Sequence, residues 1–156
     1  MTAVVVNPTD SWETWRIKTN QIGVQSNNSV QFDLSGNILS TAGNIGYTTG
    51  AGGTVTQITS KSTGVTLNKP TGSIVTMNSA LLSNATVTFT CTNSVVTQAD
   101  NIIINLRSGN ATAGTYRVWA EGISNGLFTI GIQNISGGSL SEALTLNFSI
   151  IKGSSS

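Results

Sequence analysis

The sequence predicts an all-β fold, an antiparallel β-sandwich or jelly-roll-like domain preceded by a short N-terminal helix. Three observations support this prediction. From residue 54 onward, Val, Ile and Leu alternate with Thr and Ser in short runs, which is typical of strands. Turn sequences such as "SGNATAG" and "GISNG" separate these runs at intervals of roughly 8 to 14 residues, too short for crossover helices. Thr, Ser and Asn fill 59 of the 156 positions, and the β-branched Thr side chain favours strands.

The stretch "PTDSWETWRIKTNQI" predicts the N-terminal helix. Asp10 and Glu13 have the spacing of a capping box, Pro8 precedes them, and Gly23 is a plausible stop. Four residues then follow at spacings of three and four, as in a short coiled-coil seam: Trp12, Trp15, Thr19 and Ile22. A helix this short is marginal in water, so its tryptophans need a partner surface. That surface is either the chain's own domain or an interface for oligomerisation or docking, and we expect the interface.

We expect four segments along the chain. Residues 1–25 form an arm for anchoring or oligomerisation, and residues 26–53 form a Gly- and Asn-rich connector with one weak strand over Val30–Leu34. Residues 54–152 form the β-sandwich and residues 153–156 a tail. The predicted strands of the sandwich are Val55–Thr59, Gly64–Leu67, Gly72–Met77, Ala85–Asn93, Asn101–Ser108, Gly114–Glu121, Gly126–Ile135 and Ala143–Ile151.

Three finer predictions concern single stretches. The apolar run "NIIINL" (101–106) predicts a strand buried on both faces. The stretch "ALLSN" (80–84) fits a single helical turn. In "ATVTFTCTNS", Val87, Phe89 and Cys91 share one strand face, so Cys91 is expected to be a buried structural thiol.

The composition argues against catalysis, cofactors and nucleic acid. The chain has no histidine and one cysteine, which excludes Ser-His and Cys-His catalysis and the usual zinc sites. Its six carboxylates fall at predicted turns and element ends, with no obvious catalytic pair. We therefore expect no enzyme activity, no cofactor and no metal. The seven basic residues are scattered and the net charge is +1, so no nucleic-acid partner is expected.

The sequence also bears on targeting. The start "MTAVVVNPTD" lacks the basic region and the apolar length of a signal peptide, and no segment approaches the roughly 20 apolar residues of a membrane span. We expect a protein made as a soluble product in the cytoplasm, with no membrane partner.

Two stretches resemble a β-rich module of tailed-phage and prophage virion proteins. They are "GAGGTVTQITSKSTGVTLNKPTGSIVTMNSALL" and "GTYRVWAEGISNGLFTIGIQNISGGSLSEALTLNFSIIKG", and the likeness spans Gly50 to Gly153. The segment "DSWETWRIKTNQI" is similar to the opening helix of structural proteins from marine phages that infect cyanobacteria. The resemblance implies a trimeric protein of the virion surface.

The leading hypothesis is a homotrimeric decoration protein, of the cement or head-fibre type, on the outer capsid surface. Its partners would be itself and the major capsid protein or another virion protein, through Trp12, Trp15, Thr19 and Ile22. The alternative is a tail fibre or receptor-binding component that contacts host surface glycan.

The glycan alternative depends on two aromatic residues in "TYRVWAEG". Tyr116 and Val118 share one strand face, while Arg117 and Trp119 share the other, so one of the two aromatics is expected to face the surface. Tyr116 and Trp119 are therefore the candidate glycan contacts. The competing interpretation is that both belong to a strand buried on two sides.

Overall fold

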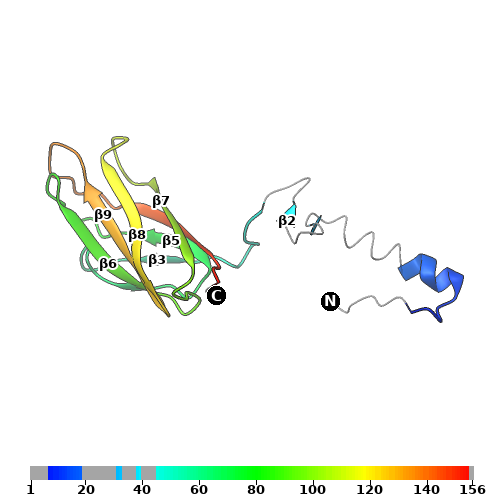
Figure 1. Cartoon of the computed structure of the whole chain (residues 1–156). Coiled ribbons are helices and arrows are strands. Elements are labelled where there is room, and N and C mark those ends of the chain that lie inside the picture. The colour runs from blue at the N-terminus through cyan, green and yellow to red at the C-terminus, as the bar shows by residue number, and fades with distance from the viewer. Residues whose placement is uncertain (1–6, 19–30, 33–37, 40–44, 155–156) are drawn as a thin grey trace. The chain divides into compact units, whose positions relative to one another are not determined.

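The chain divides into two compact units, Met1–Gly46 and Tyr47–Ser156. The computed structural model describes residues 7–18, 31–32, 38–39 and 45–154 (Figure 1). The boundary lies before the predicted one at residues 53 and 54. The Tyr47 hydroxyl donates a hydrogen bond to the carbonyl of Ile150, and the N–H of Ser73 donates to the carbonyl of Gly53 at 2.9 Å. The last residues of the predicted connector thus belong to the β unit.

The first unit contains the predicted short helix, described over residues 12–18. It also contains an antiparallel pair of two-residue strands, β1 (Gln31–Phe32) and β2 (Ile38–Leu39). The strand predicted over Val30–Leu34 is confirmed at β1. Val30, Leu34 and the predicted helix stop at Gly23 lie outside the described residues.

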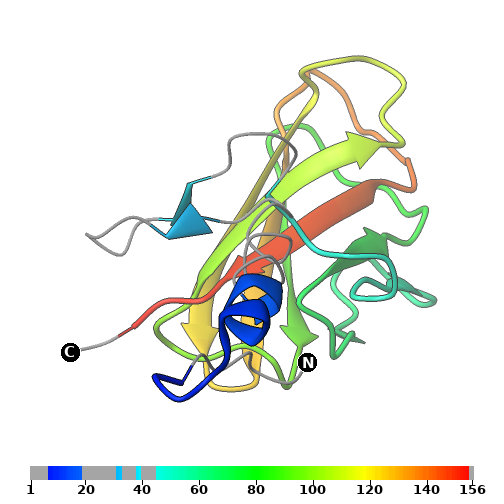
Figure 2. The same cartoon turned by 90° about the vertical axis from the view of Figure 1, so that its right-hand side faces the viewer.

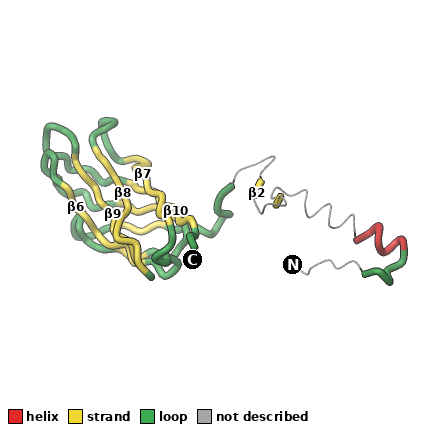
Figure 3. The backbone as a smooth tube through the Cα atoms, viewed as in Figure 1, coloured by secondary structure: helices red, strands yellow, loops and turns green. Residues whose placement is uncertain are grey.

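The second unit is a sandwich of two four-stranded sheets, as the sequence predicts (Figures 1, 2 and 3). One sheet has the order β3-β5-β10-β7 and the other the order β4-β6-β9-β8. The strands are β3 (Thr54–Thr56), β4 (Val65–Thr66), β5 (Thr71–Val75), β6 (Thr86–Thr92), β7 (Asn101–Ser108), β8 (Tyr116–Ser124), β9 (Leu127–Asn134) and β10 (Thr145–Ile151). All eight predicted strands are present.

Most strand pairs in the sandwich are antiparallel, but each sheet carries one parallel pair at an edge. These pairs are β3 with β5 and β4 with β6. Consecutive strands alternate between the two sheets, except for the hairpin β8–β9. Each crossing takes the chain over the rim of the sandwich, which explains why a turn sequence follows almost every short run.

The core lies between the two sheets and is apolar. Phe128 of β9 and Phe148 of β10 meet across it, with ring centroids 5.5 Å apart. Ile74, Ile130 and Leu146 are fully buried around them. Burial of a side chain of this size contributes about 1.5–3 kcal/mol, so these residues supply much of the stability of the unit.

Two finer predictions are wrong. The run "NIIINL" forms β7, which is an edge strand of its sheet, and Ile103 on its outward face is 54% exposed. Ile102, Ile104 and Leu106 on the inward face are partly buried against the core, so the run is covered on one face only. Residues 80–84 do not form a helical turn. Leu81 instead pairs with Leu140 in an isolated bridge, and a tight turn follows in which Asn84 has a φ of 59°.

Candidate functional site

The predicted interface residues of the N-terminal helix are exposed where they are described. Trp12 is 83% exposed and Trp15 43% exposed. The Trp15 indole N–H donates to the carbonyl of Asn7 at 3.1 Å, which fixes this ring against the start of the helix. Thr19 and Ile22 lie outside the described residues.

The cap of this helix differs from the predicted capping box by one residue. Ser11 Oγ accepts from the N–H of Thr14 at 3.3 Å, so Ser11 is the N-cap. Asp10 instead accepts from the N–H of Asn7 and pairs with Lys18 Nζ at 2.7 Å. The hydrogen bond from Lys18 is the main cause of the lowered pKa of Asp10.

Glu13, the other residue of the predicted box, pairs with Arg16 one turn later. The distance between Glu13 Oε1 and Arg16 Nη2 is 2.6 Å. This hydrogen bond lowers the pKa of Glu13 and raises that of Arg16. The helix therefore has two ion pairs along its polar side, while Trp12 stays exposed.

Of the two aromatics in "TYRVWAEG", Trp119 lies on the outer face of the β4-β6-β9-β8 sheet. It is the register partner of Gly131 on β9. A Cβ atom placed on Gly131 would lie only 2.2 Å from Cε2 and Cζ2 of Trp119, so the indole rests directly on the glycine backbone. Its N–H donates to Glu121 Oε2 at 3.0 Å. The indole ring is therefore packed on the Gly131 backbone and held at its N–H edge by Glu121.

Polar side chains surround this ring on the same sheet face. Arg117 and Glu121 flank it on β8, and their register partners on β9 are Gln133 and Thr129. The β6 residues on this face are the exposed Thr86, Thr88, Thr90 and Thr92, as the alternation in "ATVTFTCTNS" predicts. The face therefore combines one aromatic ring with hydroxyl, amide, guanidinium and carboxylate groups.

Tyr116 does not belong to this face, which corrects its assignment as a candidate glycan contact. It is 8% exposed and points into the sandwich, because residues at alternate positions of β8 face opposite sides. Burial and then the neighbouring Glu142 carboxylate raise the pKa of Tyr116. The Tyr116 hydroxyl and Glu142 Oε2 are buried, and within the described residues neither has a hydrogen-bond partner. Of the two aromatics, Trp119 is the one on the outer face of the sheet, where it is half-buried.

A buried lysine lies close to Glu142. Lys61 is 3% exposed, and its Nζ donates to the carbonyls of Met77 and Glu142, each at 2.6 Å. Burial lowers the pKa of Lys61, and the charge of Glu142 partly opposes that effect. Lys61 thereby links the turn after β3 to the segments next to β5 and β10.

Cys91 is fully buried among apolar side chains, as predicted. Burial raises the pKa of its thiol to about 12. A thiol with this pKa is almost entirely protonated near neutral pH, and the protonated form is a poor nucleophile.

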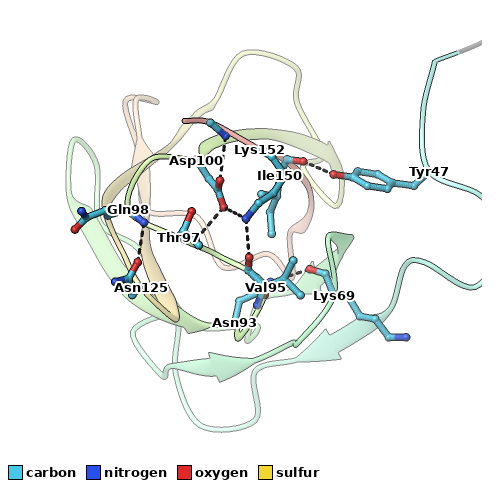
Figure 4. A network of polar contacts seen from close by, with 11 residues as sticks. Tyr47, Lys69, Asn93, Val95, Thr97, Gln98, Asp100, Asn125, Ile150 and Lys152 are labelled. Atoms are coloured by element: carbon cyan, nitrogen blue, oxygen red, sulfur yellow. Dashed lines mark hydrogen bonds and ion pairs between the residues drawn. The ribbon is translucent and has the colours of Figure 1, made fainter. Parts of the chain in front are cut away.

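A polar network closes the end of the sandwich where β7 begins and β10 ends (Figure 4). Asp100 accepts from Lys152 Nζ at 2.5 Å, from the N–H of Thr97 at 2.8 Å and from the N–H of Gly153 at 3.1 Å. Lys152 also donates to the carbonyl of Val95 at 3.0 Å. Ordered contacts therefore reach Gly153, which the sequence assigns to the tail.

The described residues contain no cluster of three or more His, Cys, Asp or Glu side chains able to hold a metal ion. Within the same ranges, none of the helices is both long enough and apolar enough to cross a membrane.

Sequence reasoning missed two features of these sites. The contact between Trp119 and Gly131 could have been predicted, because an isolated glycine inside a strand pattern marks a close approach of another group. The burial of Lys61 had no such signal, because "TSKSTG" has the composition of an exposed turn.

No protein-family model, curated protein or solved structure matches this chain.

Proposed function

We propose that this chain is a non-enzymatic structural protein of a phage particle, a homotrimer that decorates the outer surface of the capsid. The observation that carries the proposal is the exposure of Trp12, 83%, next to Trp15, 43%, on the N-terminal helix. Burial of one large apolar side chain contributes about 1.5–3 kcal/mol. A helix this short gains the most from a partner that covers both rings.

The trimer gives these rings a partner of the same kind. Three helices around a common axis would place the tryptophans of each chain against those of the other two, with Thr19 and Ile22 continuing the heptad. The arm would hold the trimer together or dock on the major capsid protein or another virion protein. The division of the chain into two units supports this separation of tasks.

The β unit supports an exposed role on the particle. Its outward strand positions are mostly Thr, Ser and Asn, and the whole chain has a net charge of only +1. Uncharged hydroxyl and amide groups satisfy surface hydrogen bonds without strong repulsion between neighbouring copies. The resemblance of residues 50–153 to a tailed-phage virion module points to the same setting.

The test is the double variant Trp12→Ala/Trp15→Ala in the full chain. We expect it to elute as a monomer in light-scattering chromatography, or to remain a trimer that no longer sediments with purified particles. The matched control is Ile58→Ala, which removes an 82% exposed side chain from the β unit. A double variant that stays trimeric and still sediments with particles contradicts the proposed role of the helix.

The position on the particle is tested by copy number, measured by quantitative mass spectrometry of purified virions. We expect a fixed ratio to the major capsid protein. A copy number that matches the tail components instead supports the alternative, a tail fibre or receptor-binding protein. Absence from virions contradicts both.

A further inference from the structure

We propose that the outer face of the β4-β6-β9-β8 sheet carries a carbohydrate-binding site centred on Trp119. The inference concerns a binding activity of the β unit. It does not depend on the oligomeric state or on where the chain sits on a particle.

The first argument is the way the indole is held. Gly131 leaves no Cβ, so the Trp119 ring lies against the sheet, and Glu121 occupies its N–H at 3.0 Å. The ring packs on the backbone at Gly131, and the Trp119 side chain remains partly exposed on this outer face. Because the N–H is already used, the ring offers a partner its electron-rich π face. Polarised C–H groups on one side of a sugar ring are the chemistry that such a flat, preorganised face favours.

The second argument is the set of groups around the ring. Arg117 and Glu121 lie two residues before and after Trp119, at about 7 Å on either side along the strand. Gln133 and Thr129 lie beside them on β9, and Thr88 lies beyond Gly131 on β6. Sugar hydroxyls both donate and accept hydrogen bonds. This face presents donors in Arg117, acceptors in Glu121 and groups of both kinds in the amide and hydroxyls.

The same neighbours argue against a protein partner. The core of a protein interface is apolar and depleted of charge, whereas Trp119 is bordered by Arg117, Glu121, Gln133 and Thr129. Groups that hydrogen-bond, placed around one aromatic ring, match a sugar ring, which carries hydroxyls at its edge and C–H groups on its face. We therefore assign this face to a sugar chain.

The test begins with a variant in which Trp119 is the only tryptophan. The chain has three, so Trp12→Phe/Trp15→Phe leaves Trp119 as the sole source of tryptophan fluorescence. This full-length protein is applied to an array of purified bacterial surface polysaccharides, both neutral and uronic-acid-containing. Fragments of the polysaccharide that is retained are then titrated while Trp119 emission is followed. We expect saturable binding with a change in the intensity or wavelength of that emission.

Two variants in the otherwise native chain test the site itself. Trp119→Ala removes the ring, and Gly131→Ala keeps the ring but forces it off its seat. We expect each to weaken polysaccharide binding by at least about tenfold, or about 1.4 kcal/mol. The matched control is Ile103→Ala, on the outer face of the opposite sheet, which should bind as the native chain does.

Thermal unfolding of each variant, followed by circular dichroism, shows whether it is folded at the temperature of the binding assay. If Trp119→Ala is unfolded there, Gly131→Ala and the conservative Trp119→Phe replace it. The proposal is overturned if the native chain retains no polysaccharide on the array. It is equally overturned if folded variants without the seated indole bind as tightly as the native chain. In that case Trp119 serves only to cover Gly131 and stabilise the sheet.

Discussion

Asp100 and Lys152 form a 2.5 Å ion pair that joins the loop before β7 to the residue after β10 (Figure 4). The Asp100 side chain is fully buried, while that of Lys152 is 55% exposed. Two backbone N–H groups, from Thr97 and Gly153, complete the shell of the carboxylate. The pair therefore fastens the last strand of the sandwich to its neighbour.

This arrangement predicts loss of stability in acid. The hydrogen bond from Lys152 is the main cause of the lowered pKa of Asp100, whose ordinary value is 3.8. Because the pKa is lower in the folded chain, the carboxylate contributes stability that is fully present above about pH 4. That contribution is lost as the pH falls below this value. Urea unfolding at pH 7 and at pH 3 should show a smaller difference in midpoint for Asp100→Asn than for the native chain.

Lys152→Met is the companion variant, because it removes the cation and leaves the carboxylate in place. It should also reduce the acid dependence of the midpoint. Equal differences between pH 7 and pH 3 for the native chain and both variants would show that Asp100 does not govern acid stability.

Gly153 should tolerate no side chain. A Cβ atom at this position would lie 1.7 Å from the carbonyl oxygen of Ala99, a backbone atom that cannot move aside alone. Gly153→Ala should therefore lose its hydrogen bond to Asp100 and lower the free energy of unfolding by about 1–3 kcal/mol. Gly137→Ala is the control, since a Cβ there meets nothing within 4 Å. It should stay within about 0.5 kcal/mol of the native chain in urea unfolding. A tolerated alanine at position 153 contradicts the close approach.

Cys91 should be inert in the native chain and reactive in the unfolded one. Its burial excludes reagents, and a pKa of about 12 leaves almost no thiolate at pH 8. Ellman's reagent should give no fast reaction in buffer and one thiol per chain in 6 M guanidinium chloride. Fast stoichiometric labelling of the native chain would show that the sheet around Cys91 opens readily.

The sequence predicted the strands correctly, but it did not predict what packs against each strand face. Alternation in "ATVTFTCTNS" correctly assigns Phe89 and Cys91 to the core and the threonines to the surface, because side chains on a strand point alternately to its two faces. The same reasoning failed for Ile103. Whether the second face of a strand is covered depends on whether another layer packs on that sheet, and the layering of a domain is a long-range property.

The candidate site shows the same limit. Alternation places Tyr116 and Trp119 on opposite faces, but it cannot say which face is the core. The core face is the one on which this sheet packs against the other sheet. The contact under Trp119 depends on the register that sets Gly131 opposite it. The hairpin turn between β8 and β9, together with the register shift between Glu121 and Ser124, sets this register.

Lys61 should stabilise the domain although it is a buried lysine. Its Nζ donates to the carbonyls of Met77 and Glu142. The Met77 carbonyl also accepts from the N–H of Ser79 at 3.0 Å, so the Glu142 carbonyl is the one that depends on Lys61. An unpaired buried acceptor costs about 1–3 kcal/mol, while loss of a buried charge offsets part of that cost. Lys61→Met should therefore lower the urea midpoint without a change in the slope of the transition. Lys69→Met is the matched control, because Lys69 Nζ lies at the surface with a single 3.4 Å contact to the carbonyl of Gly50. Equal midpoints for the two variants would mean that the Glu142 carbonyl finds another donor when Lys61 is absent.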